Sequence, residues 1–337
     1  MANQAWQNTK PGHLSLLDLV PLPKPGPGEA LGRIHAVSLN YRDILIVAHN
    51  PAYPWIAKPH VVPGSDGAGV IEEVGPDFHW KKGDRVIVQP NTWETGTDVR
   101  DNDLTKMLGG GDVDGTFRRY MVMPEDRLVR APEGMLFEET CTIYTAGVTT
   151  WHTLFHGHIK LAPGMKVLTQ GTGGLSCFAI QIAAAHGATV IATSSSDEKL
   201  EVAKKLGATR LINYGKHPEW APEVLRMADG KGVDIVVEVV GVDSIEQSVK
   251  ATRWGGSIEL VGVLSKDPAK PVNILNDLLF NGGKTSKSSI LADEWVGMNL
   301  CDSSCDPWCW KQGADRRVLK VPREAPDPST NRKNLRI

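Results

Sequence analysis

The sequence predicts an α/β protein in which a β-rich domain precedes a doubly wound parallel sheet. Three observations support this prediction. Short apolar strands alternate with helical patterns from residue 166 to residue 263, which is typical of parallel sheets. A glycine-rich turn at residues 171–176 directly follows the first of these strands. Residues 1–125 instead show strand patterns separated by glycine and proline turns.

Length and composition limit the classes of protein to consider. The chain has 337 residues, enough for two domains, with 41% hydrophobic and 23% charged residues and a formal net charge of −2. This charge gives no electrostatic reason to expect nucleic acid or an anionic membrane as a partner. No apolar run reaches the length of a membrane span, and the polar residues 1–11 do not resemble a signal peptide. We therefore expect a cytoplasmic protein.

The first 125 residues are expected to form strands joined by turns. A turn rich in proline and glycine at residues 21–28 leads into a predicted strand at residues 30–38. Residues 61–75 contain four glycines among small, apolar and acidic residues, which predicts a strongly bent strand where backbones pack closely. Further strands are predicted at residues 86–88, 116–123 and 127–130, with a loop at 92–115.

The second half of the chain is expected to form the parallel sheet. A helical pattern at residues 137–154 precedes it. The predicted strands are 166–170, 189–193, 210–213, 234–239 and 257–263. The predicted helices are 175–186, 197–206, 219–228 and 243–252. After residue 286 we find neither strand alternation nor helical periodicity, so residues 286–337 are expected to be atypical.

The glycine turn between the first strand and helix of this region indicates dinucleotide binding. Gly171 allows a tight turn, and Gly173 has no side chain to keep a pyrophosphate from the backbone. The helix N-terminus offers unpaired N–H groups and a positive dipole end. Ser176 stands at the third glycine position of G-x-G-x-x-G. The predicted cofactor contacts are Gly171, Thr172, Gly173, Gly174 and Leu175, and the alternative is a strand–helix turn that binds no ligand.

The end of the second strand bears on which dinucleotide binds. NAD enzymes usually carry an acidic residue there, which binds the ribose 2′-hydroxyl. Residues 193–196 are Thr-Ser-Ser-Ser, and we interpret the first carboxylate, Asp197, as the N-cap of the next helix. Ser194 and Ser195 can donate to a 2′-phosphate, and Lys199 can neutralise it. We therefore predict NADP, with NAD as the alternative if these serines only cap the helix.

Several further motifs stand in a characteristic order along the chain. They are Ser-Leu-Asn-Tyr-Arg-Asp at 38–43, Pro-Gly-Ser-Asp-Gly-Ala-Gly at 63–69, Gly-Asp-Arg-Val at 83–86, Ala-Gly-Val-Thr at 146–149 and the glycine turn. With them the chain resembles the medium-chain dehydrogenase/reductase superfamily, within its zinc-independent branch of quinone-oxidoreductase-like and alcohol-dehydrogenase-like proteins. The resemblance runs from about residue 5 to residue 285.

The resemblance implies a domain organisation. Residues 1–125 would form a GroES-like catalytic domain, and residues 126–285 a Rossmann domain that binds NAD(P). The active site would lie in the cleft between them. In this family the C-terminal segment returns to complete the catalytic domain, which residues 286–337 do not visibly do here. The resemblance also implies a homodimer and a small-molecule substrate.

The resemblance further allows zinc to be judged by position. Zinc-containing members place a cysteine in the loop around Asn40, Gly-His-Glu at positions 64–66, and a cysteine just before the Ala-Gly pair at 146–147. Here residues 64–66 are Gly-Ser-Asp, and Thr145 takes the place of the second cysteine. Zinc prefers thiolates and imidazoles, so hydroxyls and amides are poor replacements. We expect no bound metal.

Without a metal Lewis acid, hydride addition to an activated C=C bond of an enone, quinone or enoyl thioester is favoured. Interconversion of an alcohol and a carbonyl stays open, and so does a non-catalytic nucleotide-binding relative. The catalytic candidates are Asn40, Tyr41, Asp43 and Tyr53. Tyr53 matches the tyrosine that enoyl-reductase relatives place near the substrate, where it can donate a proton or hydrogen bond. By their positions in the pattern, Thr149, Gly241 and Val263 are further cofactor contacts.

Overall fold

The structure is a computed structural model that describes residues 3–19, 21–53, 55–77, 79–91, 103–262, 264, 272, 274, 284–288, 318–320 and 335–336. These residues belong to two compact units. The first holds the described residues up to Thr145, and the second begins at Ala146. The predicted boundary at residue 125 lies earlier in the chain, before a short helix, α2 (Phe137–Thr140), that packs on strands of the first unit.

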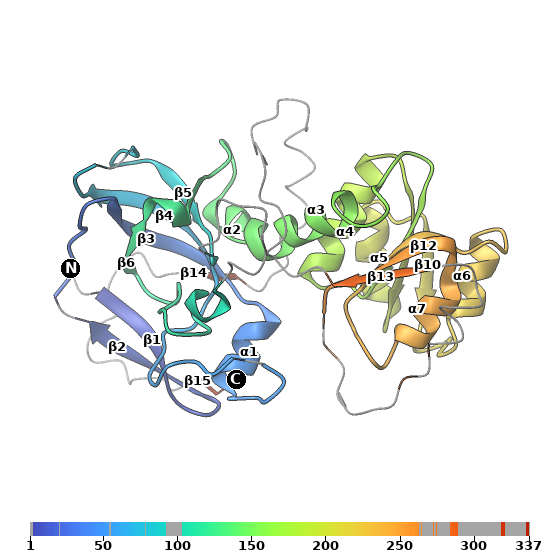
Figure 1. Ribbon diagram of the computed structural model, residues 1–337, viewed down its shortest axis with the longest axis horizontal. Helices are drawn as coiled ribbons and strands as arrows, with labels where there is room; N and C mark the ends of the chain where they lie inside the picture. The colour runs from blue at the N-terminus through green and yellow to red at the C-terminus, as the bar shows by residue number, and fades with distance from the viewer. Residues whose placement is uncertain are drawn as a thin grey trace. The chain divides into compact units, whose positions relative to one another are not determined.

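The first unit is built from antiparallel strands (Figure 1). They are β1 (Asn3–Lys10), β2 (His13–Leu19), β3 (Glu29–Ser38), β4 (Asp66–Val74), β5 (Arg85–Val88), β6 (Tyr120–Pro124) and β7 (Leu128–Arg130), with short 3₁₀ turns at Leu104–Lys106 and Glu125–Arg127. β1 and β2 form a hairpin, and β3, β4, β5 and β7 follow one another in the larger sheet. The core between them includes Ile34, Ile71 and Val86.

Close backbone packing between β3 and β4 explains the glycines of β4. A Cβ added at Gly69 would lie 2.0 Å from the carbonyl oxygen of Arg33, so only glycine fits. The pairing of β3 with β4 shifts register twice, between Leu31 and Gly32 and again between Ile34 and Ala36. Such irregularities bend a strand pair. The close backbone packing expected at these glycines is therefore present at Gly69.

Two helical features of the first half differ from the sequence prediction. A seven-residue helix, α1 (Tyr41–Val47), follows β3 and was not predicted, because its apolar residues at 44–47 are consecutive and show no helical period. The predicted helix at 137–154 is instead divided into α2, a π-helical segment at Ile143–Val148, and α3 (Thr149–Phe155). Between them the hydroxyls of Thr140 and Thr142 donate to backbone carbonyls three or four residues earlier, which competes with regular helix.

The second unit contains the predicted parallel sheet. Its strands are β8 (Lys166–Gln170), β9 (Thr189–Ser194), β10 (Arg210–Asn213), β11 (Val233–Glu238), β12 (Thr252–Leu260) and β13 (Thr285–Ser288). Their order is β10-β9-β8-β11-β12-β13, so the order reverses between β8 and β11. The doubly wound fold expected from the sequence is thus confirmed. β13, which pairs with β12, was not predicted, because its residues Thr-Ser-Lys-Ser include no apolar side chain.

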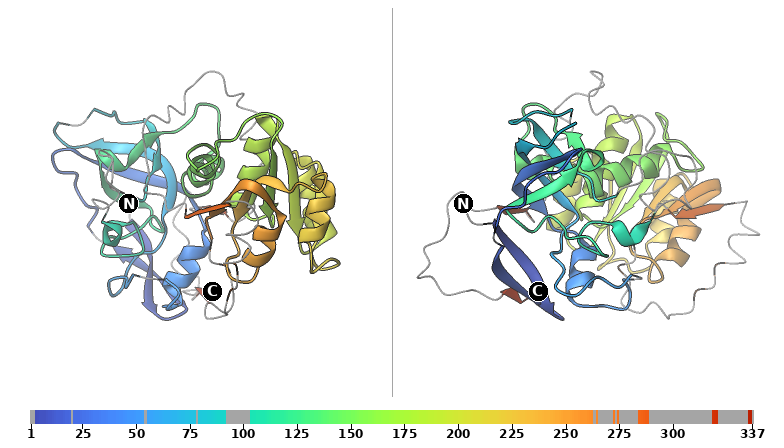
Figure 2. Two further views of the ribbon diagram at one scale, coloured as in Figure 1. Left: turned by 45° about the vertical axis from the view of Figure 1, so that its right-hand side comes forward. Right: turned by 60° about the vertical axis from the view of Figure 1, so that its left-hand side comes forward.

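Helices cover both faces of this sheet, as can be followed in Figures 1 and 2. They are α4 (Gly174–Ala185), α5 (Asp197–Lys205), α6 (Ala221–Met227) and α7 (Ile245–Ala251). Val167 of β8 packs in one core with α4 and α5, whereas its neighbour Leu168 packs in the other with α6 and α7. Successive side chains of a strand point to opposite faces, so an apolar run such as β8 serves both cores.

Two strands of the C-terminal segment join the first unit. β14 (Val318–Lys320) pairs with the end of β3, and β15 (Leu335–Arg336) pairs with the start of β2. The sequence pattern had indicated no strand in this region, and that prediction was wrong. Strands of two or three residues are too short to show alternation. Among the described residues, no helix has both the length and the apolar character that a membrane span requires.

Replacing Gly69 tests the close approach of β3 and β4. We expect Gly69→Ala to lower the free energy of unfolding by about 2 kcal/mol or more, because the new methyl group would displace backbone. Gly67→Ala is the matched control on the same strand, since its Cβ would meet the side chain of Thr116 at 3.1 Å. Urea unfolding of both variants measures the difference, and a Gly69→Ala variant as stable as Gly67→Ala would contradict the packing argument.

Candidate functional site

The glycine turn leaves open space beside the start of a helix. β8 ends at Gln170, and α4 begins at Gly174 with Gly173 as its N-cap. Gly171 has φ of +72° and donates its N–H to the carbonyl of Thr193 at 2.8 Å. A Cβ added at Gly171 or Gly173 would have no atom within 4 Å. The twelve-residue helix α4 therefore points its unpaired N–H groups into open space, an arrangement that fits a pyrophosphate.

Neighbouring residues hold this turn in place. Ser176, at the third glycine position of the motif, is buried and donates its hydroxyl to the carbonyl of Gln170 at 2.7 Å. Thr150 on α3 donates to the carbonyl of Leu175 at 3.2 Å. Thr149, a predicted cofactor contact, is buried on the same helix. Leu175 thus lies where α3 contacts the first turn of α4.

The serines at the end of β9 lie where the sequence pattern expected them. Ser194 is buried at the end of the strand, and Ser195 is exposed. The N-cap of α5 is Ser196, whose hydroxyl accepts from the N–H of Lys199 at 3.4 Å, so the assignment of the cap to Asp197 was wrong. Lys199 is an exposed residue in the first turn of α5.

Asp197 is instead paired with residues at and just after the end of β10. Lys216 donates to its carboxylate at 2.6 Å, and Asn213 donates at 2.7 Å. These two hydrogen bonds, that of Lys216 first, lower the pKa of Asp197. Lys216 therefore places a second cation near the serines. The sequence analysis missed it, although a lysine just after a short strand at the same edge of a parallel sheet was a usable signal.

The remaining predicted cofactor residues follow the strands on the other side of β8. Gly241 comes after β11 with φ of +96°, a conformation that favours glycine. Val263 lies outside the described residues. Its neighbour Gly262 packs so closely that an added Cβ would lie 2.2 Å from the carbonyl oxygen of Val239.

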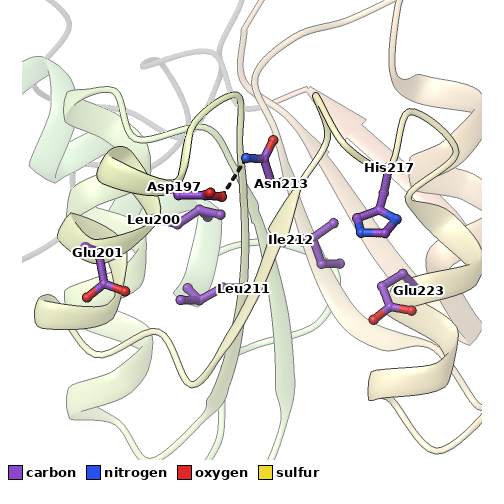
Figure 3. Close-up of a pocket in the computed structure, with 8 residues that line it drawn as sticks. All are labelled: Asp197, Leu200, Glu201, Leu211, Ile212, Asn213, His217 and Glu223. Atoms are coloured by element: carbon purple, nitrogen blue, oxygen red, sulfur yellow. Dashed lines mark hydrogen bonds between the residues drawn. The ribbon is translucent and has the colours of Figure 1, made fainter.

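A hollow elsewhere in the second unit is shown in Figure 3. It has a volume of about 320 Å³ and lies along β10 between α5 and α6. Its lining includes three acidic residues, Asp197, Glu201 and Glu223. This hollow does not include the glycine turn, and its acidic lining is unsuited to phosphate.

The first unit contains a polar cluster formed by Asn40, Ser65, Asp66 and Thr145. The amide of Asn40 donates to Asp66 Oδ2 at 3.0 Å and to Ser65 Oγ at 3.2 Å. Thr145 donates its hydroxyl to Asp66 Oδ1 at 2.6 Å. Asp66 and Ser65 are buried, whereas Asn40 and Thr145 are partly exposed. The positions judged for zinc in the sequence therefore do converge in space.

The donor set of this cluster does not fit zinc. An amide, two hydroxyls and one carboxylate contain neither a thiolate nor an imidazole. Both carboxylate oxygens of Asp66 already accept hydrogen bonds from Thr145 and Asn40. Among the described ranges, no group of three or more His, Cys, Asp or Glu side chains is arranged to hold a metal ion. The residues of this cluster therefore do not fit a zinc ion.

Burial dominates the electrostatics of the two acids here. It raises the pKa of Asp66 to about 7, against the lowering effects of the Thr145 and Asn40 hydrogen bonds and with a further rise from Asp43. Burial also raises the pKa of Asp43, although Arg42 and backbone N–H groups oppose it. The N–H of Asn40 donates to Asp43 Oδ2 at 2.9 Å, which caps α1. Asp43 is thus a helix-capping acid, and Asn40 links it to Asp66.

The tyrosine candidates differ in their surroundings. Tyr53 is partly exposed, and its Oη accepts from Arg42 Nη2 at 3.0 Å. Arg42 Nη1 donates to the carbonyl of Leu108 at 3.1 Å, which fixes the guanidinium. A Cβ at Gly110 would lie 2.2 Å from both Arg42 Nη2 and Tyr53 Oη, so glycine makes room for the pair. Tyr41 is the exposed first residue of α1.

Comparisons with known proteins agree with this architecture. Residues 26–133 match the model described as "Alcohol dehydrogenase GroES-like domain", and residues 174–299 match "Zinc-binding dehydrogenase". The second match does not cover the polar cluster, so its name says nothing about the residues there. The GroES-like domain and the parallel-sheet domain expected from the sequence are both recovered by these matches.

Individual relatives extend over most of the chain. A zinc-type alcohol dehydrogenase-like protein of Schizosaccharomyces pombe is 45% identical over 251 residues, which are 74% of this chain and 71% of the relative. The solved structure of an NAD-dependent alcohol dehydrogenase is 32% identical, with a TM-score of 0.75 over 86% of this chain and 85% of that one. A quinone oxidoreductase of Pseudomonas syringae pv. Tomato is 29% identical, with a TM-score of 0.71 over 86% and 82% of the two chains.

The raised pKa of Asp66 predicts a pH-dependent stability. The folded state binds this proton more tightly than the unfolded state, where the pKa is near 3.8. The stabilisation is therefore full below pH 3.8 and is lost as the pH rises to about 7, at about 1.4 kcal/mol per pH unit. We expect Asp66→Asn to flatten the fall of the unfolding free energy between these pH values, as measured by urea unfolding.

The pKa of Asp43 is also raised, so the unfolding free energy of Asp66→Asn should still fall with pH, but less steeply than in the wild type. Asp18→Asn is the control, because Asp18 lies on the hairpin of β1 and β2, where it accepts an exposed hydrogen bond from Gln4. It should keep the full wild-type slope. An Asp66→Asn variant with that same slope would contradict the argument.

Proposed function

The chain belongs to the medium-chain dehydrogenase/reductase family, and from that premise we propose that it is a zinc-free, NADP(H)-dependent oxidoreductase. An oxidoreductase that uses a nicotinamide cofactor follows from the dehydrogenases and reductases among its relatives. The finer proposal is hydride transfer to an activated C=C bond of an enone, quinone or enoyl compound, or between an alcohol and a carbonyl. The cluster around Asp66 is the observation that carries it.

Asp66 supports the absence of zinc from the reaction. Its two oxygens are occupied by Thr145 and Asn40 at 2.6 and 3.0 Å, so the cluster is closed by hydrogen bonds instead of a cation. Hydride addition to an activated C=C bond needs less polarisation than reduction of a simple carbonyl, because the negative charge spreads onto an oxygen that hydrogen bonds can stabilise. Similarity to the quinone oxidoreductase of Pseudomonas syringae pv. Tomato supports addition to a C=C bond. Similarity to the alcohol dehydrogenases supports interconversion of an alcohol and a carbonyl.

Different residues of the chain would bind the cofactor and act on the substrate. When bound, the nicotinamide supplies the hydride chemistry. The turn at residues 171–175 binds and orients the cofactor through backbone N–H groups. Tyr53 accepts a hydrogen bond from Arg42, so its own hydroxyl proton is directed elsewhere and can be donated to a substrate oxygen. Asn40, Tyr41 and Asp43 stay predicted catalytic residues, with Asp43 acting through the position of Asn40.

Two features support NADP over NAD. The end of β9 carries serines and no carboxylate at residues 193–196. The first carboxylate after them, Asp197, is already paired with Lys216 at 2.6 Å, so its charge is offset. With Lys216 neutralising Asp197, Lys199 in the first turn of α5 adds positive charge at this edge, which suits a 2′-phosphate. The homodimer implied by the family resemblance stays a prediction.

Cofactor oxidation over a substrate panel tests the proposed function. We expect the purified protein to oxidise NADPH with a quinone or enone, or to reduce NADP⁺ with an alcohol, and a zinc chelator should leave the rate unchanged. Gly173→Val is the control, since it fills the open space at the turn and should abolish the activity. Activity that a chelator removes and zinc restores would contradict the zinc-free proposal. NADPH binding without turnover would instead indicate a nucleotide-binding relative.

The cofactor preference can be tested separately at the end of β9. We expect Ser195→Asp and Lys199→Ala each to weaken NADPH binding about tenfold, because one adds a charge that repels the 2′-phosphate and the other removes an attractive one. NADH binding should change little. Lys204→Ala, in the last turn of α5, is the matched control and should leave both affinities unchanged. Tighter binding of NADH than NADPH by the wild-type protein would refute the preference.

A further inference from the structure

We propose that the side chains of Gln170 and Glu238 form a clasp that sets the spacing of the two loops on either side of the cofactor crevice. Glu238 is then a positioning residue for the dinucleotide. This inference rests on the proposed function, because it assigns a role toward the cofactor that function requires. Neither residue was a predicted cofactor contact.

The clasp lies where the strand order reverses. β8 and β11 are adjacent and parallel, and the chain continues from them toward opposite edges of the sheet. Ligands of open parallel sheets bind in the crevice that opens at such a reversal, beyond the carboxyl ends of the strands. Gln170 is the last residue of β8 and directly precedes the glycine turn. Glu238 is the last residue of β11 and directly precedes the loop at residues 239–241.

Glu238 holds the loop that follows its own strand. Its Oε1 accepts from the backbone N–H groups of Val240 at 2.9 Å and Gly241 at 3.0 Å, and from Ser244 Oγ at 2.7 Å. Its Oε2 accepts from Gln170 Nε2 at 2.7 Å and from the hydroxyl of Ser248 on α7. One carboxylate therefore joins the loop after β11, helix α7 and the end of β8.

Gln170 carries the connection to the glycine turn. Its amide donates to Glu238 and, at 2.8 Å, to Ser248, while its Oε1 accepts from the N–H of Val239 at 3.2 Å. Its backbone carbonyl accepts the hydroxyl of Ser176 in the first turn of α4. A change in the length or polarity of the clasp would thus move the turn at 171–175 relative to Gly241.

Burial makes this arrangement demanding. Glu238 is 0% exposed and Gln170 3% exposed, and both lie between apolar residues of the sheet. A carboxylate removed from water is costly unless every lone pair is matched by a donor. The five donors around Glu238 meet this condition. Packing alone would be served as well by an apolar side chain of similar volume, so we assign the polar pair to the geometry of the loops.

An exchange of the acid and the amide tests the clasp. In Glu238→Gln, the new amide N–H₂ group must face either the amide of Gln170 or the two backbone N–H groups, so donor opposes donor. In Gln170→Glu, two carboxylates face each other. The double variant restores complementarity, because the amide introduced at position 238 can donate to the carboxylate introduced at position 170 and still accept from the backbone of the loop.

Cofactor binding is the readout, measured by fluorescence titration with NADPH and NADH on the full chain. We expect each single exchange to raise the Kd and KM for both dinucleotides about tenfold or more, with kcat at saturating cofactor within about threefold of wild type. The double exchange should return the Kd to within about threefold of wild type.

Asp234→Asn is the matched control for a merely structural role. Asp234 is on the same strand, at its opposite end, where it accepts from the N–H of Lys166 at 2.7 Å and from Arg253 Nε at 2.6 Å. It also joins β11 to β8, but far along the strands from the crevice. We expect Asp234→Asn to lower the melting temperature while leaving the Kd for NADPH unchanged.

Several outcomes would overturn the proposal. They are a wild-type Kd in Glu238→Gln, an equal rise of Kd in Asp234→Asn, or a double exchange that binds no better than the single ones. If the single exchanges do not fold, Ser244→Ala removes only one donor to Glu238, and an unchanged Kd in that variant would overturn the clasp. A wild-type chain that binds neither dinucleotide contradicts the proposed function, whereas normal binding by the variants contradicts the clasp alone.

Discussion

The reversal of strand order between β8 and β11 is the constraint on which the rest of the second unit depends. Because the chain continues from these neighbouring strands toward opposite edges of the sheet, a crevice is expected to open at their carboxyl ends. The glycine turn, the loop around Gly241 and the buried side chains of Gln170 and Glu238 all lie at this opening. The helices on the two faces pack on apolar runs such as β8, so the sheet that carries the turn is buried on both sides.

Each unit contains a buried carboxyl group that accepts hydrogen bonds, Glu238 in the second unit and Asp66 in the first. Glu238 is surrounded by five donors, among them two backbone N–H groups, and so ties loops together. Burial raises the pKa of Asp66 to about 7, with a further rise from Asp43, although the hydrogen bonds from Thr145 and Asn40 lower it. The hydrogen bonds of Glu238 hold loops of the second unit, whereas burial makes Asp66 a group that exchanges a proton near neutral pH.

Membership of a family known for zinc does not decide the chemistry of this chain. The four positions judged for zinc do come together, but they hold an amide, two hydroxyls and a carboxylate that bond to one another. The hydrogen bonds take over the cross-linking that a metal would provide between the start of α1, the start of β4 and Thr145. A scaffold can therefore bring the positions of a metal site together while the residues there form a hydrogen-bonded cluster.

Local pattern was enough to predict the parallel sheet, its helices and the glycine turn, because strand and helix periods are properties of a few neighbouring residues. It was also enough to predict that the serines at 194–196 lie at the end of β9. Elements such as α1 and β13 were missed because their own residues show no such period: α1 has a run of four consecutive apolar residues at 44–47, and β13 has no apolar residue. The pairing of Glu238 with Gln170, of Asp66 with Thr145, and of Asp197 with Lys216 was decided only by the tertiary structure. Each joins residues 19 to 79 positions apart, and the strength of a buried hydrogen bond depends on burial and partners that no local pattern contains.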